Sequence, residues 1–247
     1  MAIGAVVQGL LRNGACCVLA VDGGSRDDTR RVATESGAIV VQDMRRGYGR
    51  ACLTGAERAL ASDPVERPAN DDAHVHDAVA FLDGDGSCDP GDLPDLVTAL
   101  DGVDLVLGTR SRRRIEAGAM PWHARLGNAL VSAMLSVRTG RRTHDLPPFK
   151  VIRRAALERL DLDDAGYGWT AQLVTRALAD PGVTIRERSV IFRRRAGGVS
   201  KVSGDWRASV RAGRAMISVG WRESRSRPVV AMMAKAPGAG HAKTRLA

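Results

Sequence analysis

The sequence predicts an α/β fold: a mostly parallel sheet with helices on both faces. In the first half of the chain, short apolar runs alternate with segments in which apolar residues lie three or four positions apart. Apolar runs that end in turn residues are typical of buried strands, and the longer spacing is typical of helices. Strands that alternate with helices favour a parallel sheet, because each helix carries the chain back to the start of the next strand.

The predicted elements follow one another closely. A helix over 3–11 ends at Asn13-Gly14, and a strand over 17–21 leads to a helix that starts near Asp27. The remaining elements, in order, are a strand at 38–41, a turn at 46–49, a helix at 51–60, a polar surface loop at 62–77, a strand at 79–82, a helix at 92–100 and a strand at 105–108.

The composition narrows the class of protein. The 247 residues are 44% hydrophobic and contain no apolar run of 18, so we expect no membrane span. The net charge of +9 comes almost wholly from arginine, since only four lysines are present. Aromatic residues are only 4% and no nucleic-acid-binding motif occurs, so we expect no nucleic-acid partner. The four cysteines lack metal-ligand spacing, which favours reduced thiols in a cytoplasmic protein.

The most informative motif is VAFLDGDGSCDP, over Val79–Pro90. An apolar strand ends in Asp83 and Asp85, which glycines separate and follow. Ligands of open α/β sheets lie at the carboxyl ends of strands, and paired carboxylates suit Mg²⁺ or Mn²⁺ together with substrate phosphates. From this motif alone, an acidic turn that closes a strand is an equally good interpretation, because Asp-Gly pairs also mark turns.

Eight motifs, in order along residues 1 to about 220, resemble family 2 glycosyltransferases, and most of all their polyprenyl-phosphate mannosyl- and glucosyltransferase branch. They are VDGGSRDDT (21–29), GYGRACLTG (47–55), FLDGDGSCDP (81–90), LGTR (107–110), MPWHARLGN (120–128), HDLPPFKVIRR (144–154), GYGW (166–169) and RRRAGGVSKVSG (193–204). The resemblance implies a GT-A fold, an inverting reaction and a nucleotide-diphosphate-sugar donor. It favours the metal interpretation of the two aspartates.

The resemblance also implies roles for individual residues. Asp85 would hold the metal, Asp83 would hold the metal or the ribose, and Asp22 would bind the nucleoside. Arg110 and Arg125 would face phosphates, which fits the charge that develops on a departing nucleoside diphosphate. Three residues on a glycine-containing loop would close over the diphosphate, with Lys201 counted among the catalytic groups. These three are Arg195, Ser200 and Lys201.

Each of these residues also has a purely structural interpretation. Asp22 could cap a turn, and Arg110 could be a solvated charge at the sheet rim. In the run Arg193–Arg195 we expect two solvated arginines and one functional one. Trp122 and Trp169 are expected to pack as aromatic anchors.

The chain departs from the family pattern at three places. It starts at the helix that normally follows a first strand, so we expect that strand to be missing from the sheet and its neighbours to be exposed. Gly23 replaces a second aspartate that would contact the nucleoside. Gln172 lies where the family often has Glu, and an amide is no general base. This mildly favours a phosphate acceptor, which is already an anionic nucleophile, but it also fits an inactive enzyme.

The C-terminal part is predicted to be separate. We expect a glycosyltransferase domain over 1–221, a linker over 222–228 and the beginning of a second GT-A-like domain, related to nucleotidyltransferases, over 229–247; a disordered basic tail is the alternative. Over 205–221 an apolar stripe at helical spacing (Trp206, Val210, Ile217, Trp221) indicates a helix that either docks on the domain or lies at a membrane surface.

The sequence therefore predicts a cytoplasmic hexosyltransferase that uses Mg²⁺ or Mn²⁺ and a UDP-glucose or GDP-mannose type donor. Its acceptor would be a polyprenyl phosphate or another small molecule, with peripheral contact at the inner face of a membrane left open. Two alternatives remain: an inactive remnant that binds nucleotide, and nucleotidyl transfer carried by the missing remainder of the C-terminal domain.

Overall fold

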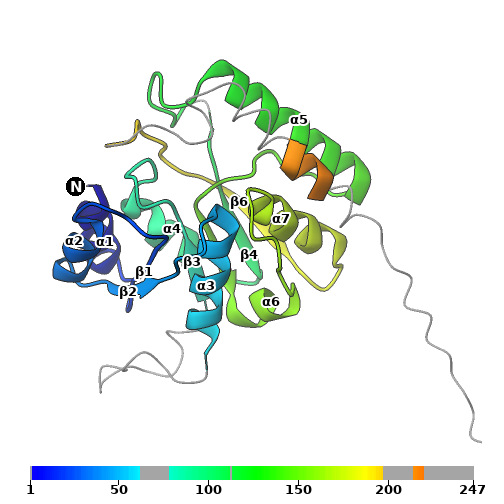
Figure 1. The fold of residues 1–247 in the computed structure, drawn as a ribbon. Helices are drawn as coiled ribbons and strands as arrows, with labels where there is room; N and C mark the ends of the chain where they lie inside the picture. Colours follow the sequence, from blue (N-terminus) through cyan, green and yellow to red (C-terminus); the bar gives the residue numbers. More distant parts are fainter. Residues whose placement is uncertain (1, 62–77, 112, 197–213, 220–247) are drawn as a thin grey trace, which may run out of the picture.

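The computed structural model describes residues 2–61, 78–111, 113–196 and 214–219 (Figure 1). Its elements are α1 (Ala2–Arg12), β1 (Leu19–Asp22), α2 (Thr29–Glu35), β2 (Ile39–Gln42), α3 (Tyr48–Leu60), β3 (Ala78–Phe81), the 3-10 turn η1 (Pro90–Asp92), α4 (Leu93–Thr98), β4 (Leu105–Thr109), α5 (Trp122–Thr139), β5 (Lys150–Arg153), α6 (Arg154–Arg159), α7 (Trp169–Ala179) and β6 (Ile185–Ser189). The expected loop over 62–77 lies outside the described residues.

The strands form two sheets, and the larger one is mixed rather than mostly parallel. β1 and β2 pair in parallel, while the second sheet has the order β3-β5-β4-β6. β5 is antiparallel to both β3 and β4, and only β4 and β6 are parallel. Lys150, the first residue of β5, pairs with Phe81 and Leu107 near the ends of the neighbouring strands, so β5 runs back between them. The long connection from β4 through α5 does not return the chain to the start of the sheet.

Helices cover both faces of the four-stranded sheet, as predicted. The side chains of β4 alternate: Leu105 and Leu107 face a core shared with α3, α5, α6 and α7, while Val106 faces a core shared with α1 and α4. All three are fully buried. This period of two is what a strand buried on both faces requires. The α/β class predicted from the sequence is confirmed.

The two sheets leave an interruption between β1 and β3. Among the described residues, β1 pairs only with β2 and β3 pairs only with β5, although α3 contacts both strands. Leu19, Ala20 and Val21 of β1 are only partly buried, and Ala80 of β3 is exposed. We expected the neighbours of a missing strand to be exposed, and this arrangement fits that expectation; the missing strand itself stays a prediction.

Two further expectations concern the cysteines and the helices. All four cysteines are free, and burial raises the pKa of the Cys52 thiol to about 11 and that of Cys88 to about 12. No helix in the described part of the chain is long and apolar enough to cross a membrane. Residues 214–219 are helical and dock on the domain, with Val219 buried and Met216 packed against the core. The rest of the predicted 205–221 helix lies outside the described residues.

Candidate active site

Two carboxylates follow β3 on a glycine-rich turn. Asp83 and Asp85 are both partly buried, and Asp85 accepts the backbone N–H of Ser87 through Oδ1 at 2.9 Å, which fixes the turn. Gly86 has a φ of +79°, a conformation that favours glycine. The structure thus places both predicted metal ligands in one turn just after a strand, as the motif implied.

The segment 190–196 lies across this turn. Phe192 bridges to Cys88, and the backbone N–H groups of Arg193 and Ala196 donate to the carbonyls of Ser87 and Asp85 at 2.8 and 3.1 Å. Arg195 then reaches Asp85, with Nε 3.0 Å from Oδ2. An arginine predicted to contact the diphosphate therefore already pairs with a predicted metal ligand.

Asp83 lies beside Asp85 without such a partner. Among the described residues, no hydrogen bond or ion pair to its carboxylate is found. Burial raises the pKa of Asp83, and the neighbouring Asp85 charge raises it further, while Lys150, Arg195 and Arg110 act in the opposite direction. A carboxylate that is largely withdrawn from water and has no donor is costly in its ionised form, and a bound cation would relieve that cost.

Beneath Asp83 lies a fully buried lysine that the sequence analysis overlooked. The Lys150 ammonium donates to Thr170 Oγ1 at 3.2 Å and lies 5.0 Å from the centre of the Trp169 ring. Tyr48 Oη is 3.3 Å from the same Thr170 oxygen. Burial lowers the pKa of Lys150. This cluster links β5, α7 and α3 directly below the carboxylate turn.

Two Gly-Tyr-Gly motifs dock on each other beside this cluster. The N–H groups of Gly49 and Arg50, in the first turn of α3, donate to the carbonyls of Gly166 and Ala165 at 2.9 and 3.0 Å. A Cβ on Gly49 would lie 2.2 Å from the Asp164 carbonyl oxygen, so only glycine allows this approach. Tyr48 and Gly49, predicted to be in a turn, therefore belong to α3, because the 164–166 loop caps its open N–H groups.

Arg110 forms a buried ion pair at the end of β4. Its Nε and Nη2 donate to the Asp145 carboxylate at 2.9 and 2.6 Å, and its backbone N–H donates to the same carboxylate at 2.7 Å. Nη2 also approaches Asn128 Oδ1 of α5 at 3.3 Å. The guanidinium is therefore no solvated rim charge; it joins β4, α5 and the loop before β5. Contact with phosphate stays a prediction.

The remaining predicted site residues show no contact with the carboxylate turn among the described residues. Asp22 is buried at the end of β1 and accepts the Ser25 N–H at 3.1 Å, which is a turn-closing contact; nucleoside binding stays a prediction. Arg125 is exposed on α5 and donates through Nε to the Met120 carbonyl at 3.1 Å. Ser200 and Lys201 lie outside the described residues.

The arginine run Arg193–Arg195 is exposed and also forms ion pairs. All three arginines are exposed, so the expectation of solvated positions is met, and each also has an acidic partner: Arg193 pairs with Asp89, Arg194 with Glu116 and Arg195 with Asp85. The segment crosses the carboxylate turn so closely that each arginine meets an acid on a neighbouring loop.

Gln172 has a structural role that the sequence analysis did not foresee. It is buried, and its Oε1 accepts the backbone N–H groups of Asp163 and Asp164, each at 2.9 Å. The amide thus fastens the 161–168 loop to α7. An amide held in this way is no general base, as expected, and the preference for a phosphate acceptor that we drew from Gln172 stays a prediction.

The carboxylate turn fits a divalent ion that is only partly enclosed by protein. Asp83 and Asp85 offer hard oxygen ligands, and the Asp83 carboxylate has no competing donor among the described residues. In the same part of the chain, no cluster of three or more His, Cys, Asp or Glu side chains is arranged to hold a metal. This donor set suits Mg²⁺ or Mn²⁺, which take one or two carboxylates and complete their shell with phosphate oxygens and water.

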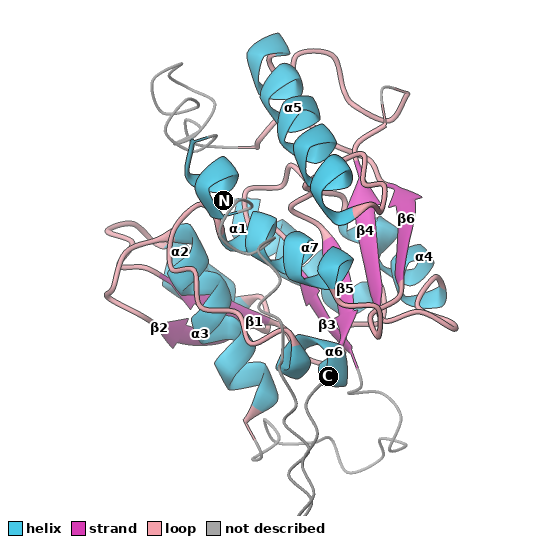
Figure 2. Cartoon of the chain, turned by 90° about the vertical axis from the view of Figure 1, so that its right-hand side faces the viewer, coloured by secondary structure: helices cyan, strands magenta, loops and turns pink. Residues whose placement is uncertain are grey.

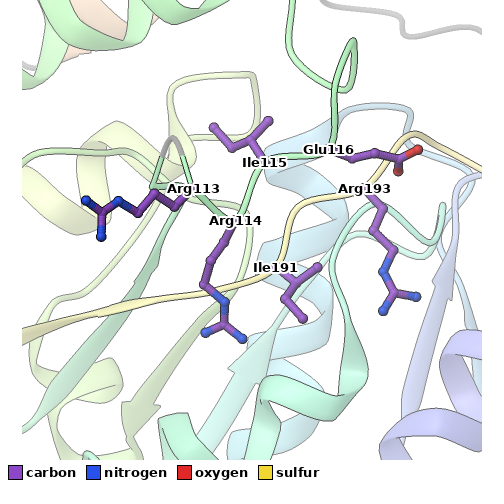
Figure 3. Close-up of a pocket in the computed structure, with 6 residues that line it drawn as sticks. All are labelled: Arg113, Arg114, Ile115, Glu116, Ile191 and Arg193. Carbon is purple, nitrogen blue, oxygen red and sulfur yellow. The ribbon is translucent and has the colours of Figure 1, made fainter.

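An open hollow lies beside this turn (Figure 3). It measures about 470 Å³ and is lined by Arg113, Arg114, Ile115, Glu116, Ile191 and Arg193. Arg114 pairs with the buried Asp92 at 3.1 Å, and Arg193 pairs with Asp89. Arg113 is exposed, and its side chain points away from Arg193. The hollow is thus lined by arginines, of which Arg114 and Arg193 pair with aspartates.

Comparison with known proteins identifies the family of this chain. The family described as "Glycosyl transferase family 2" matches residues 2–161. An uncharacterized glycosyltransferase of Mycobacterium tuberculosis is 42% identical over 194 residues, which span 78% of this chain and 80% of the relative. The undecaprenyl-phosphate mannosyltransferase of Micrococcus luteus is 30% identical over 200 residues, 76% of each chain.

Solved structures give the same fold. Glucosyl-3-phosphoglycerate synthase of Mycobacterium tuberculosis, crystallised with Mn²⁺, uridine diphosphate and phosphoglyceric acid, aligns with a TM-score of 0.62 at 19% identity, over 90% of this chain and 74% of that one. At this identity the likeness establishes the GT-A-like fold alone. With the family match and the close mycobacterial relative, it leads to one conclusion: the chain belongs to the family 2 glycosyltransferases.

Proposed function

We propose that this glycosyltransferase transfers a hexose, with inversion, from a nucleotide-diphosphate sugar to a phosphate oxygen of a polyprenyl-phosphate-like acceptor, and that Asp83 and Asp85 hold the Mg²⁺ or Mn²⁺ that the donor requires. The carboxylate turn carries the proposal. It combines a partly buried aspartate that has no partner among the described residues with a second aspartate whose partner is an arginine. When bound, the ion would neutralise charge on the leaving diphosphate.

The chain's own residues would bind and orient the donor. Arg195, which pairs with Asp85 in the absence of ligand, would exchange to the diphosphate once a cation occupies the turn. Among the described residues, Asp145 takes Nε and Nη2 of Arg110, and Nη1 would serve this purpose. Asp22 would bind the nucleoside, and Arg125, Ser200 and Lys201 would add contacts to phosphates. Fixed arginines stabilise developing negative charge without reorganisation during the reaction.

Among the described residues, the acids around the turn are paired or would hold the cation, which supports an acceptor that needs no general base. Around the turn, Asp89, Asp92 and Glu116 are all paired with arginines. Asp83 and Asp85 would be committed to the cation. A phosphate oxygen is already anionic and could attack the sugar directly, whereas a hydroxyl would need a base. The Micrococcus luteus relative is named for a polyprenyl-phosphate acceptor, which fits this class.

The proposal is tested by a transfer assay with radiolabelled UDP-glucose and GDP-mannose in the presence of Mn²⁺. The acceptors are undecaprenyl phosphate and, as a hydroxyl acceptor, 3-phosphoglycerate. We expect a labelled lipid from one donor, and we expect Asp85→Asn to lower kcat/KM by about a hundredfold or more. Transfer only to 3-phosphoglycerate would keep the donor site but refute the choice of acceptor.

A folded protein that binds donor but transfers to neither acceptor would instead support the nucleotide-binding remnant. Gly23 and the interrupted sheet beside β1 are the features that favour this second possibility. The nucleotidyltransferase alternative depends on residues 229–247, which lie outside the described residues.

A further inference from the structure

Helix α5 is apolar on the face that it turns away from the protein. Of its 18 residues only Val131, Ser132 and Leu135 are buried. On the opposite side, Trp122, Leu126, Leu130 and Val137 are 76%, 53%, 60% and 85% exposed. Together with the exposed Ala129 and Ala133, these residues form one continuous row at helical spacing, which we call the α5 stripe. Trp122 is therefore not the packed anchor that its motif led us to expect.

Such a helix is unusual in a protein surrounded by water. Surface helices normally carry polar residues on the outer face, and helices that are apolar all round are normally covered on every side. α5 lies along the outside of the domain in both views (Figures 1 and 2). Contiguous exposed apolar surface of this kind marks a site of interaction.

We propose that the α5 stripe is a docking surface for an anionic lipid bilayer. The helix contains no aspartate or glutamate, and it carries Arg125 and Arg138. Arg113 and Arg142, on the loops before and after it, are also exposed. Apolar residues that enter the acyl boundary, flanked by arginines that reach anionic headgroups, are the features by which helices lie in a membrane interface.

The same features favour a bilayer over a second protein. A stable interface takes about 20–30 residues from each partner, whereas the stripe offers six on one convex helix. A bilayer needs no complementary shape. It also accepts tryptophan at its boundary, where an apolar ring meets water.

The position of α5 connects this surface to the active site. Asn128 of α5 approaches Arg110 Nη2 at 3.3 Å and accepts the Leu146 N–H at 3.1 Å. Asn128 lies on the inward face of the helix, so a bilayer against the stripe would be separated from the loop that holds Arg110 by the width of α5. The inference goes beyond the proposed function, because membrane binding through α5 does not require that the acceptor be a lipid. It also differs from the predicted interfacial helix at 205–221, whose described part docks on the domain.

The test is co-sedimentation of the full chain with vesicles of phosphatidylcholine alone or mixed with phosphatidylglycerol. We expect binding to the mixed vesicles that weakens as salt is raised. The double variant Leu126→Glu/Leu130→Glu should lower the partition coefficient by about tenfold or more, since two leucines no longer enter the bilayer. Val97→Glu on α4, at a 48% exposed valine away from the stripe, should bind as the parent does.

Circular dichroism melting of each variant shows that it is folded before binding is compared. Two results would overturn the proposal: a folded parent that stays in the supernatant with both vesicle types, or a double variant that binds as well as the parent. Light scattering that finds a dimer dissociated by the same double variant would assign the stripe to a second copy and would also overturn it.

Discussion

Replacing Asp145 with alanine should destabilise this protein severely. Asp145 and Arg110 are only 5% and 13% exposed, and the carboxylate accepts three hydrogen bonds from Arg110 at 2.6 to 2.9 Å. Asp145→Ala would leave a buried guanidinium and a buried backbone N–H without an acceptor. Removing one partner of a buried ion pair typically costs about 3–5 kcal/mol. That is a large share of the roughly 5–15 kcal/mol that holds a domain folded.

Urea unfolding followed by circular dichroism measures this cost. With an m-value of about 2 kcal/mol/M, the midpoint should fall by about 1.5–2.5 M. Glu35→Ala is the matched control, because it breaks the Glu35–Arg31 pair, in which both side chains are more than half exposed. That change should cost about 0–1 kcal/mol.

A second variant separates the ion pair from simple packing. Arg110→Met combined with Asp145→Leu replaces both charges by apolar groups, and it should recover much of the stability that Asp145→Ala loses. If Asp145→Ala shifts the midpoint no more than Glu35→Ala does, the guanidinium is not buried as the structure has it, and the position assigned to Arg110 is refuted.

Three further outcomes are expected. Gly49→Ala should destabilise the fold by about 1–3 kcal/mol in urea unfolding, because its Cβ would meet the Asp164 carbonyl, whereas Gly127→Ala, with open space around it, should stabilise α5 by about 0.5–1 kcal/mol; equal effects would contradict the docking of the two Gly-Tyr-Gly motifs. Because the pKa of Asp83 is raised, Mn²⁺ affinity should fall on acidification at a pH above the ordinary carboxyl range, and a midpoint within that range would contradict its burial. Ionising Asp83 costs folding free energy above that raised pKa, so Asp83→Asn should raise the metal-free Tm at neutral pH while weakening metal binding; an unchanged Tm would oppose the assignment.

The elements of the fold that were predicted correctly are those that depend on the pattern of residues within one short stretch of sequence. Helical spacing located α1, and apolar runs located β1, β2, β3 and β4 within one or two residues of their bounds. The pair Asp83 and Asp85 could be placed at a strand end because the strand and the turn lie in one stretch of sequence. The two aspartates belong to one of eight motifs that occur in the order typical of family 2 glycosyltransferases, and this order indicated the family.

The parts that could not be predicted depend on contacts between distant segments. The antiparallel direction of β5 follows from the path of the chain through α5, and no residue pattern within β5 itself indicates that direction. Asp145 lies 35 residues from Arg110, and Tyr48 lies 122 residues from Thr170. Lys150 had a signal that was not used: a single lysine inside the apolar run Phe149–Ile152 indicates a buried charge.

The measurement that tests the central claim most directly is calorimetric titration of UDP-glucose and GDP-mannose, with and without Mn²⁺, on the full chain and on Asp85→Asn. The account predicts that one donor binds in a metal-dependent manner and that the variant, folded by circular dichroism, loses this binding. Binding that is equal with and without Mn²⁺, or equal in Asp85→Asn, would contradict a donor site at the Asp83–Asp85 turn.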